Sequence, residues 1–147
     1  MRLYLLRHGA AEERREGMGD YDRRLTIPGI AEMERVAIGL KMLVGEIDLI
    51  LSSPLPRALE TARIAATALG VASERLVVSD HLSAGRFDKK SLQSLSHSLA
   101  AGHRVMAVGH EPDLSGLVRE LTGATIEMKK AGLAFIETYG AENDSGI

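Results

Sequence analysis

Short apolar runs alternate along the chain with longer segments in which apolar residues recur every three or four positions. Short runs bounded by turn residues are typical of buried strands, and the longer pattern is typical of helices that cover a sheet. Strands are predicted at residues 3–6, 48–51, 76–78, 104–108 and 133–136. Helices are predicted between Thr26 and Gly45, between Leu55 and Gly70, at 89–100, and between Pro112 and Gly123. This alternation predicts an α/β fold, a single three-layer α/β/α domain with a mostly parallel sheet.

The ends of the first predicted helix carry the expected signals. Thr26 can cap it, Pro28 falls in its first turn, and Gly45 ends it. One face of this helix presents apolar residues at helical spacing, which we interpret as core and to which we assign no chemistry: Ile30, Met33, Ala37, Leu40 and Val44.

The composition narrows the class of protein without changing this fold. A chain of 147 residues suits one domain, which we expect at 1–140, followed by a polar, frayed tail at 141–147. The formal net charge of −2 does not indicate a nucleic-acid partner. No apolar run approaches the roughly 20 residues of a membrane span or suits a signal peptide, so we expect no membrane partner and a cytoplasmic location. The absence of cysteine excludes disulfides, thiolate catalysis and zinc–sulfur sites.

Polar residues directly follow each of the first four predicted strands. The carboxyl ends of parallel strands meet at one edge of a sheet, and ligands bind at that edge in open α/β folds. The groups that would meet there are Arg7 and His8, Ser52 and Ser53, Asp80 and His81, and Gly109 and His110. Scattered surface residues would not follow the strands in this way, so we predict a functional site at this edge.

Two further segments bear on that site. Residues 9–25 form a long predicted loop, and long ordered loops are often functional, although Arg14 and Arg15 are interpreted as surface residues. Arg57 lies in the first turn of the second helix, where a cation opposes the helix dipole. A bound anion would relieve this mismatch, because helix N-termini and arginine both bind phosphate.

The polar residues also form recognisable motifs. Arg7-His8-Gly9 resembles the RHG signature of the histidine phosphatase (phosphoglycerate mutase-like) superfamily. Three later segments resemble the family's other motifs: residues 22–26 with Gly29, residues 52–58 with Thr61 and Ala62, and residues 108–110. The motifs occur in the family's order and span residues 3 to about 136, so the resemblance implies a phosphoglycerate mutase-like fold for the whole domain.

The resemblance implies a role for each matching side chain. His8 would be the nucleophile that accepts a phosphoryl group, and its oxygens would be held by Arg7, Arg57 and His110. The residue types suit this chemistry, because arginine is permanently charged and histidine can be neutral near pH 7. His110 could be protonated and serve as a third donor. Water would then hydrolyse the covalent phosphohistidine, with no cofactor and no metal ion.

One segment departs from the family pattern and indicates a subfamily. Many relatives carry an acidic proton donor shortly after the third strand, but residues 82–85 read Leu-Ser-Ala-Gly. The connection from there to the next helix is short, whereas larger relatives insert a lid. The chain therefore most resembles the short phosphohistidine phosphatases of the SixA type, whose open pocket would admit the phosphohistidine side chain of a phosphorylated protein.

Other functions compete with this hypothesis. A phosphatase for a small phosphorylated metabolite would use the same residues. A non-catalytic, phosphate-binding regulatory module would have no need of the nucleophilic imidazole of His8. A mutase would favour a closed lid, and a metal-dependent hydrolase would need ligand pairs that the five histidines do not form.

Some residues beside the predicted site have two interpretations. Glu111 could donate a proton to the leaving group, or it could only stabilise the N-terminus of the helix that begins at Pro112. Two further pairs are interpreted as capping or solvated surface residues rather than catalytic ones: Asp80 with His81, and Lys129 with Lys130.

Overall fold

The computed structural model describes residues 1–97 and 99–137. Its strands are β1 (Arg2–Arg7), β2 (Leu49–Ser52), β3 (Leu76–Val78), β4 (Arg104–Gly109) and β5 (Leu133–Glu137). Its α-helices are α1 (Ile27–Leu43), α2 (Pro56–Leu69), α3 (Lys89–Ser96) and α4 (Asp113–Thr122). Short 3-10 helices are η1 (Asp20–Asp22), η2 (Ser73–Arg75) and η3 (Asp80–Leu82). The tail predicted at 141–147 lies outside the described residues.

The sheet has five strands in the order β3-β2-β4-β1-β5. The first four in this order are parallel, and β5 runs antiparallel to β1. The register places Arg7 beside Gly109 and Ser52 beside Val108, so β1, β4 and β2 end at the same level. The predicted α/β fold with a mostly parallel sheet is confirmed, and the residues that follow these strands share one edge of the sheet.

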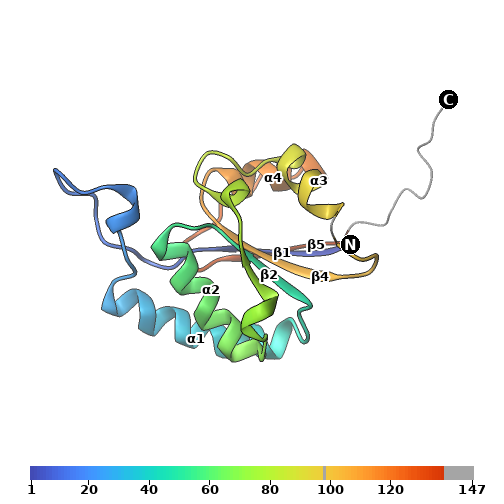
Figure 1. The fold of residues 1–147 in the computed structure, drawn as a ribbon, viewed down its shortest axis with the longest axis horizontal. Coiled ribbons are helices and arrows are strands. Elements are labelled where there is room, and N and C mark those ends of the chain that lie inside the picture. The colour runs from blue at the N-terminus through green and yellow to red at the C-terminus, as the bar shows by residue number, and fades with distance from the viewer. Residues whose placement is uncertain (98, 138–147) are drawn as a thin grey trace.

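Helices cover both faces of the sheet (Figure 1). α1 and α2 pack on one face, and α3 and α4 pack on the other. Alternate side chains of a strand point to opposite faces. Tyr4 and Leu6 of β1 therefore join the core beneath α1 and α2, whereas Leu3 and Leu5 join the core on the other side. Because both faces are buried, a shift of one residue in β1 would disrupt both cores, and this fixes the position at which β1 ends.

The start of α1 is capped as the sequence indicates, but its buried face differs from the expected one. The Thr26 hydroxyl accepts a hydrogen bond from the Gly29 N–H at 3.0 Å. Gly29 is buried and Ile30, which was expected in the core, is exposed. The reason is a close approach of the chain after β1, because a Cβ atom on Gly29 would overlap the Ala10 carbonyl oxygen. The first turn of α1 therefore meets the loop backbone and does not present an apolar side chain to the core.

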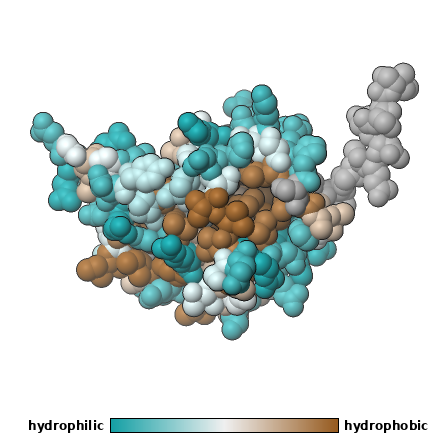
Figure 2. Space-filling model, in the orientation of Figure 1, coloured by the Kyte–Doolittle hydropathy of each residue, from teal (hydrophilic) through white to brown (hydrophobic). Residues whose placement is uncertain are grey.

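β3 and α3 are less buried than their sequence patterns suggest. β3 is an edge strand of three residues, and its Val77 and Val78 are exposed. α3 begins at the cap residue Asp88, which accepts the Ser91 N–H at 2.8 Å, and ends at Ser96 rather than at residue 100. Apolar side chains also reach the surface on the face of the molecule shown in Figure 2. No helix in the described part of the chain is long and apolar enough to cross a membrane.

We expect Gly29→Ala to destabilise the protein by about 1–3 kcal/mol, because the added methyl group would push the loop after β1 away from α1. Gly39→Ala in the same helix is the matched control, since a Cβ atom there would meet no atom within 4 Å. The free energy of unfolding of this control should rise by roughly 0.5–1 kcal/mol, because alanine has a higher helix propensity than glycine. Urea denaturation measures both values, and equal stability of the two variants would contradict the close approach.

Candidate active site

The candidate site lies where β1, β2 and β4 end. His8 directly follows β1, Ser53 follows β2, and His110 follows β4. The His8 N–H donates to the Gly109 carbonyl at 3.1 Å, and the Ser53 N–H donates to the Val108 carbonyl at 3.0 Å. These backbone bonds extend the parallel pairing one residue beyond the strands. They place three polar side chains from distant parts of the sequence at one edge of the sheet.

The His8 ring is buried and has one fixed tautomer. His8 is only 6% exposed, and its Nδ1 lies 2.7 Å from the Gly9 carbonyl oxygen. A carbonyl oxygen can only accept, so Nδ1 carries the proton and the lone pair lies on Nε2. The Gly9 N–H donates to the Thr61 hydroxyl at 3.1 Å, and that hydroxyl donates to the Arg57 carbonyl at 2.7 Å. The backbone that orients His8 is thereby tied to the first turns of α2.

His110 lies beside His8. The two ring centroids are 5.2 Å apart and the ring planes are inclined by 56°. His110 is 2% exposed, and its Nε2 lies 2.7 Å from the Ser53 hydroxyl oxygen. The ring is therefore fixed by the residue that follows β2, which is the neighbour of β4 in the sheet.

Two arginines complete the group that the sequence predicts. Arg7 donates from Nη1 to the Met128 carbonyl at 2.8 Å, in the segment that precedes β5. Arg57 is 4% exposed. Its Nη1 donates to the Asp20 carbonyl at 3.2 Å and lies 3.5 Å from the Asp20 carboxylate oxygen Oδ1. Each guanidinium is thus held at one nitrogen by the protein, which leaves other N–H groups of the planar fork for a ligand.

Several side chains of this group carry buried nitrogen atoms that have no hydrogen-bond partner. Among the described residues, the buried side-chain nitrogen atoms without a hydrogen-bond partner include Nε of Arg7, Nε of Arg57 and Nδ1 of His110. Leaving a buried donor unpaired costs about 1–3 kcal/mol. Three such atoms on neighbouring side chains, two of which are cationic, are suited to an anion that accepts several hydrogen bonds.

Burial and positive charge keep both imidazoles neutral. Burial is the main cause that lowers the pKa of His8 to about 4, opposed by the bond to the Gly9 carbonyl and assisted by the charges of Arg57 and Arg7. Burial, then the charge of Arg57, lowers the pKa of His110 to about 3. At pH 7, the His8 ring is therefore neutral. The protonated His110 that the sequence allowed is disfavoured, because it would add a buried charge beside arginines.

Asp20 and Arg23 also lie close to this group of side chains, although neither was predicted as a site residue. Asp20, in η1, contacts Arg57 and also accepts from Arg14 at 3.3 Å. Partial burial opposes its ionisation, but the charge of Arg57 and the bond from Arg14 hold the pKa of Asp20 below its usual value. Arg23 donates to the Glu12 carbonyl at 2.8 Å, and its charge helps to lower the pKa of His8. For Asp20 the only sequence signal was the unusual length of the loop, whereas Arg23 lies in the segment 22–26 that resembles a family motif.

Glu111 has a structural contact at the start of α4. Its Oε1 accepts a hydrogen bond from the Ser115 N–H at 2.9 Å. This contact satisfies one of the free N–H groups at the helix N-terminus and places a negative charge at the positive end of the helix dipole. The position of Glu111 therefore supports the second of its two interpretations.

Other polar residues stay at the surface. The residues interpreted as capping or solvated are all exposed: Asp80 and His81 in η3, and Lys129 and Lys130 before β5. The described residues contain no group of three or more histidine, aspartate or glutamate side chains that could hold a metal ion. The available ligands at the site are therefore donors and cations, which suit an anionic group.

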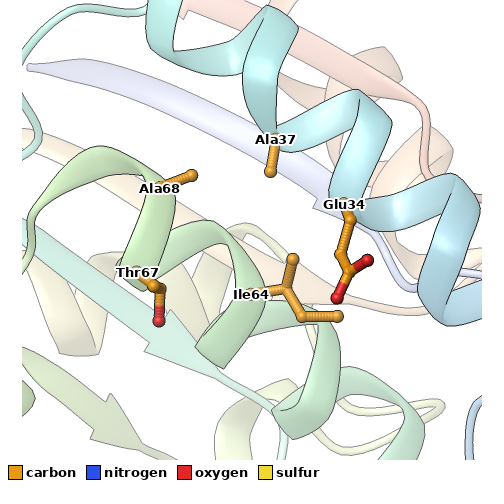
Figure 3. A pocket seen from close by; sticks show the side chains of 5 residues that line it. All are labelled: Glu34, Ala37, Ile64, Thr67 and Ala68. Carbon is orange, nitrogen blue, oxygen red and sulfur yellow. The ribbon is translucent and has the colours of Figure 1, made fainter.

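A separate hollow of about 280 Å³ lies between α1 and α2 (Figure 3). It is lined by Glu34 and Ala37 from α1 and by Ile64, Thr67 and Ala68 from α2. None of the site residues described above lines it, and its side chains are mostly apolar. It offers no cation to bind an anion and belongs to the packing of the helix layer.

Known proteins share both the sequence pattern and the fold. The family model described as Histidine phosphatase superfamily (branch 1) matches residues 3–101. An uncharacterized protein of Picosynechococcus sp. is 34% identical over 150 residues, which cover 96% of this chain and 87% of that protein. A solved structure of the protein histidine phosphatase SixA complexed with tungstate is similar at 29% identity and a TM-score of 0.78, over 93% of this chain and 88% of that chain. A candidate phosphohistidine phosphatase SixA from Agrobacterium tumefaciens is similar at 27% identity and a TM-score of 0.76, over 91% and 89%.

We expect His8 to titrate with a pKa of about 4 and to show the Nδ1–H tautomer at pH 7. Arg57→Met keeps an apolar stem of similar length but removes the charge, so it should raise the pKa of both His8 and His110. NMR of ring-labelled histidines measures both quantities, with His8→Asn used to assign the signals. Titration of His8 near the ordinary histidine pKa of about 6.5 would contradict the buried and cationic environment.

Proposed function

We propose that this chain, which belongs to the histidine phosphatase superfamily, hydrolyses a phosphoryl group by transferring it first to His8 and then to water. Nε2 of His8 would attack phosphorus while the bond from phosphorus to the leaving group breaks. Water would then attack the phosphohistidine, breaking the P–N bond and releasing inorganic phosphate. Splitting the reaction into two displacements suits a neutral nucleophile whose lone pair lies on Nε2.

The observation that carries this proposal is that an unprotonated imidazole nitrogen lies among buried N–H groups that have no hydrogen-bond partner. His8 Nε2 is unprotonated because Nδ1 is held by the Gly9 carbonyl. Around it, Nε of Arg7, Nε of Arg57 and Nδ1 of His110 are buried and have no hydrogen-bond partner. In phosphoryl transfer, charge spreads over three equatorial oxygens, and preorganised donors aimed at those oxygens stabilise the transition state.

The same donors support a reaction without a metal ion. The two guanidinium groups of Arg7 and Arg57 supply the positive charge that a divalent cation provides in other phosphatases. Arg57 is anchored through its Nη1 to the loop that carries Asp20, so its fork is held in place before substrate binds. A fixed donor needs little reorganisation during the reaction, which is the main advantage of such a site.

For the substrate, we propose the phosphohistidine of a partner protein. The segment between β3 and α3 contains only the short η3, and Asp113 at the start of α4 holds it by accepting from the Gly85 N–H at 2.7 Å. Its two carboxylates have other places: Asp80 is exposed in η3, and Asp88 caps α3 by accepting from the Ser91 N–H at 2.8 Å. A leaving imidazole can depart neutral without an acid if its other nitrogen carries a proton, so a segment that offers no acid to the site favours phosphohistidine over alkyl phosphates. The two SixA structures that the chain resembles support the same choice.

We expect rapid quenching with a ³²P-labelled phosphohistidine peptide to trap a phosphoramidate on the protein, labile in acid and stable in base. The reaction should proceed with undiminished rate in the presence of EDTA. His8→Ala should lose turnover by at least about 10³-fold, because the covalent route is removed. Thr61→Ser, which keeps the hydroxyl contact to Gly9, is a control for disturbance of the fold.

The outcomes separate the competing functions. Turnover of phosphosugars or nucleotides in preference to the peptide would replace the partner protein with a small metabolite. Phosphate binding without any turnover would indicate a regulatory module. Full turnover by His8→Ala, or a strict need for an added divalent ion, would refute the mechanism.

We expect Glu111→Gln to cause small and equal losses on three substrates: an alkyl phosphate, p-nitrophenyl phosphate and a phosphohistidine peptide. The reason is that the Glu111 carboxylate is engaged by the Ser115 N–H, where it serves α4. General acid catalysis contributes about 10²–10⁴-fold when the leaving group is poor. A selective loss of that size on the alkyl phosphate alone would instead establish Glu111 as the proton donor.

A further inference from the structure

The hydrogen bonds of Ser53 determine what His110 can do. Ser53 is fully buried, and its Oγ lies 2.7 Å from His110 Nε2. The same oxygen accepts a hydrogen bond from the Leu55 N–H at 3.2 Å. Among the described residues, His110 Nε2 is the acceptor available to the Ser53 hydroxyl proton. The pairing that satisfies both groups of this contact has the Ser53 O–H donating to Nε2, which then carries no proton.

This pairing leaves the proton of the neutral His110 ring on Nδ1. Nδ1 is buried and has no hydrogen-bond partner. The reverse arrangement, with Nε2–H donating to Ser53, would leave the buried hydroxyl without an acceptor and would turn Nδ1 into a lone pair. A lone pair beside the phosphoryl oxygens would repel them, whereas an N–H would bind them.

We propose that Ser53 is a positioning residue, which holds His110 as the Nδ1–H tautomer so that Nδ1 donates to a phosphoryl oxygen. This inference rests on the proposed function for its ligand, but the tautomer itself can be measured without any turnover. Ser53 and His110 would then mirror the pair formed by Gly9 and His8. A carbonyl that accepts makes His8 a nucleophile at Nε2, and a hydroxyl that donates makes His110 a donor at Nδ1.

The backbone around Ser53 suits this task. Its N–H donates to the Val108 carbonyl at 3.0 Å and so continues the pairing of β2 with β4. Ser53 is thus held at its N–H and its side chain before any ligand binds. A fixed hydroxyl imposes the tautomer at little entropic cost, which is the property required of a group that orients a catalytic donor.

Ser52 provides a matched control. Both serines are fully buried and adjacent, but the Ser52 hydroxyl donates to the Ser53 carbonyl and makes no bond to an imidazole. Ser52→Ala and Ser53→Ala each remove one buried oxygen from the end of β2. A general disturbance of this segment would affect both variants, whereas loss of the tautomer should follow only from Ser53→Ala.

The test is ¹⁵N NMR of ring-labelled histidines at pH 7, combined with binding of orthovanadate. We expect the Nδ1–H tautomer of His110 in the unmodified protein and in Ser52→Ala. An unconstrained neutral imidazole favours Nε2–H, so Ser53→Ala should shift His110 toward that tautomer and weaken vanadate binding by about tenfold, the size of one hydrogen bond to a charged group. Ser53→Thr keeps the hydroxyl and should retain the Nδ1–H tautomer.

An Nε2–H tautomer in the unmodified protein, or an unchanged tautomer in Ser53→Ala, would overturn the proposal. Equal changes in Ser52→Ala and Ser53→Ala would also overturn it. The signals of His8 report whether each variant is folded, since its tautomer depends on the Gly9 carbonyl and not on Ser53. If the unmodified protein hydrolyses no phosphorylated substrate, the proposed function fails, while the NMR result still decides the role of Ser53.

Discussion

The hydrogen bond between His8 Nδ1 and the Gly9 carbonyl is the interaction on which the candidate site depends. It leaves the lone pair on Nε2, and without it the ring would have neither a fixed tautomer nor a fixed orientation. The backbone that makes this bond is held by the two strands on either side of β1. The His8 N–H donates to the Gly109 carbonyl on the side of β4, and the His8 carbonyl accepts from the Ala131 N–H before β5, each at 3.1 Å. The His8 ring is therefore oriented by backbone bonds that continue the pairing of β1 with its two neighbouring strands.

Neutral imidazoles and buried guanidinium groups place opposite demands on this edge of the sheet. Burial favours neutral histidines, but it penalises the charge of Arg57, whose pKa it lowers. Asp20 offsets part of that penalty through its carbonyl and its carboxylate. The compensation is incomplete, since Nε of Arg57 has no partner. The site thus contains a positive charge and an N–H group that the protein does not fully satisfy. An anion that accepts several hydrogen bonds would satisfy both.

The sequence predicted the groups whose position follows from local rules. Strand ends were visible because apolar runs stop at Arg7 and before His110, and parallel strands bring such ends together. Arg57 was visible because a cation in the first turn of a helix is unusual. These rules use only neighbouring residues and the direction of the strands, so they work without knowledge of the order of strands in the sheet.

The contacts that were not predicted depend on which segments become neighbours in space. Asp20 reaches Arg57 only because the loop after β1 folds back over α2, and no periodic pattern in the loop encodes that path. The bond from Ser53 to His110 requires β2 to lie beside β4, which are not consecutive strands. Ile30 was expected in the core because apolar periodicity ignores the loop backbone that occupies the space at Gly29.

The burial that keeps His8 and His110 neutral also makes the stability of the fold depend on pH. In the unfolded chain, His8 and His110 bind protons as the pH falls through about 6.5, whereas the folded protein takes them up only near 4 and 3. Between these values the unfolded state binds more protons than the folded state. The contribution of these two histidines to the free energy of unfolding is therefore fully present above about pH 6.5 and declines as the pH falls. A bound phosphoryl group would act in the opposite direction, because ligands that bind only the folded state stabilise it. Its negative charge would also offset that of Arg57 and raise the pKa of both rings. The arginines that would bind such an anion therefore carry buried donors at a cost to stability, and an anion that accepts from their N–H groups would lower that cost.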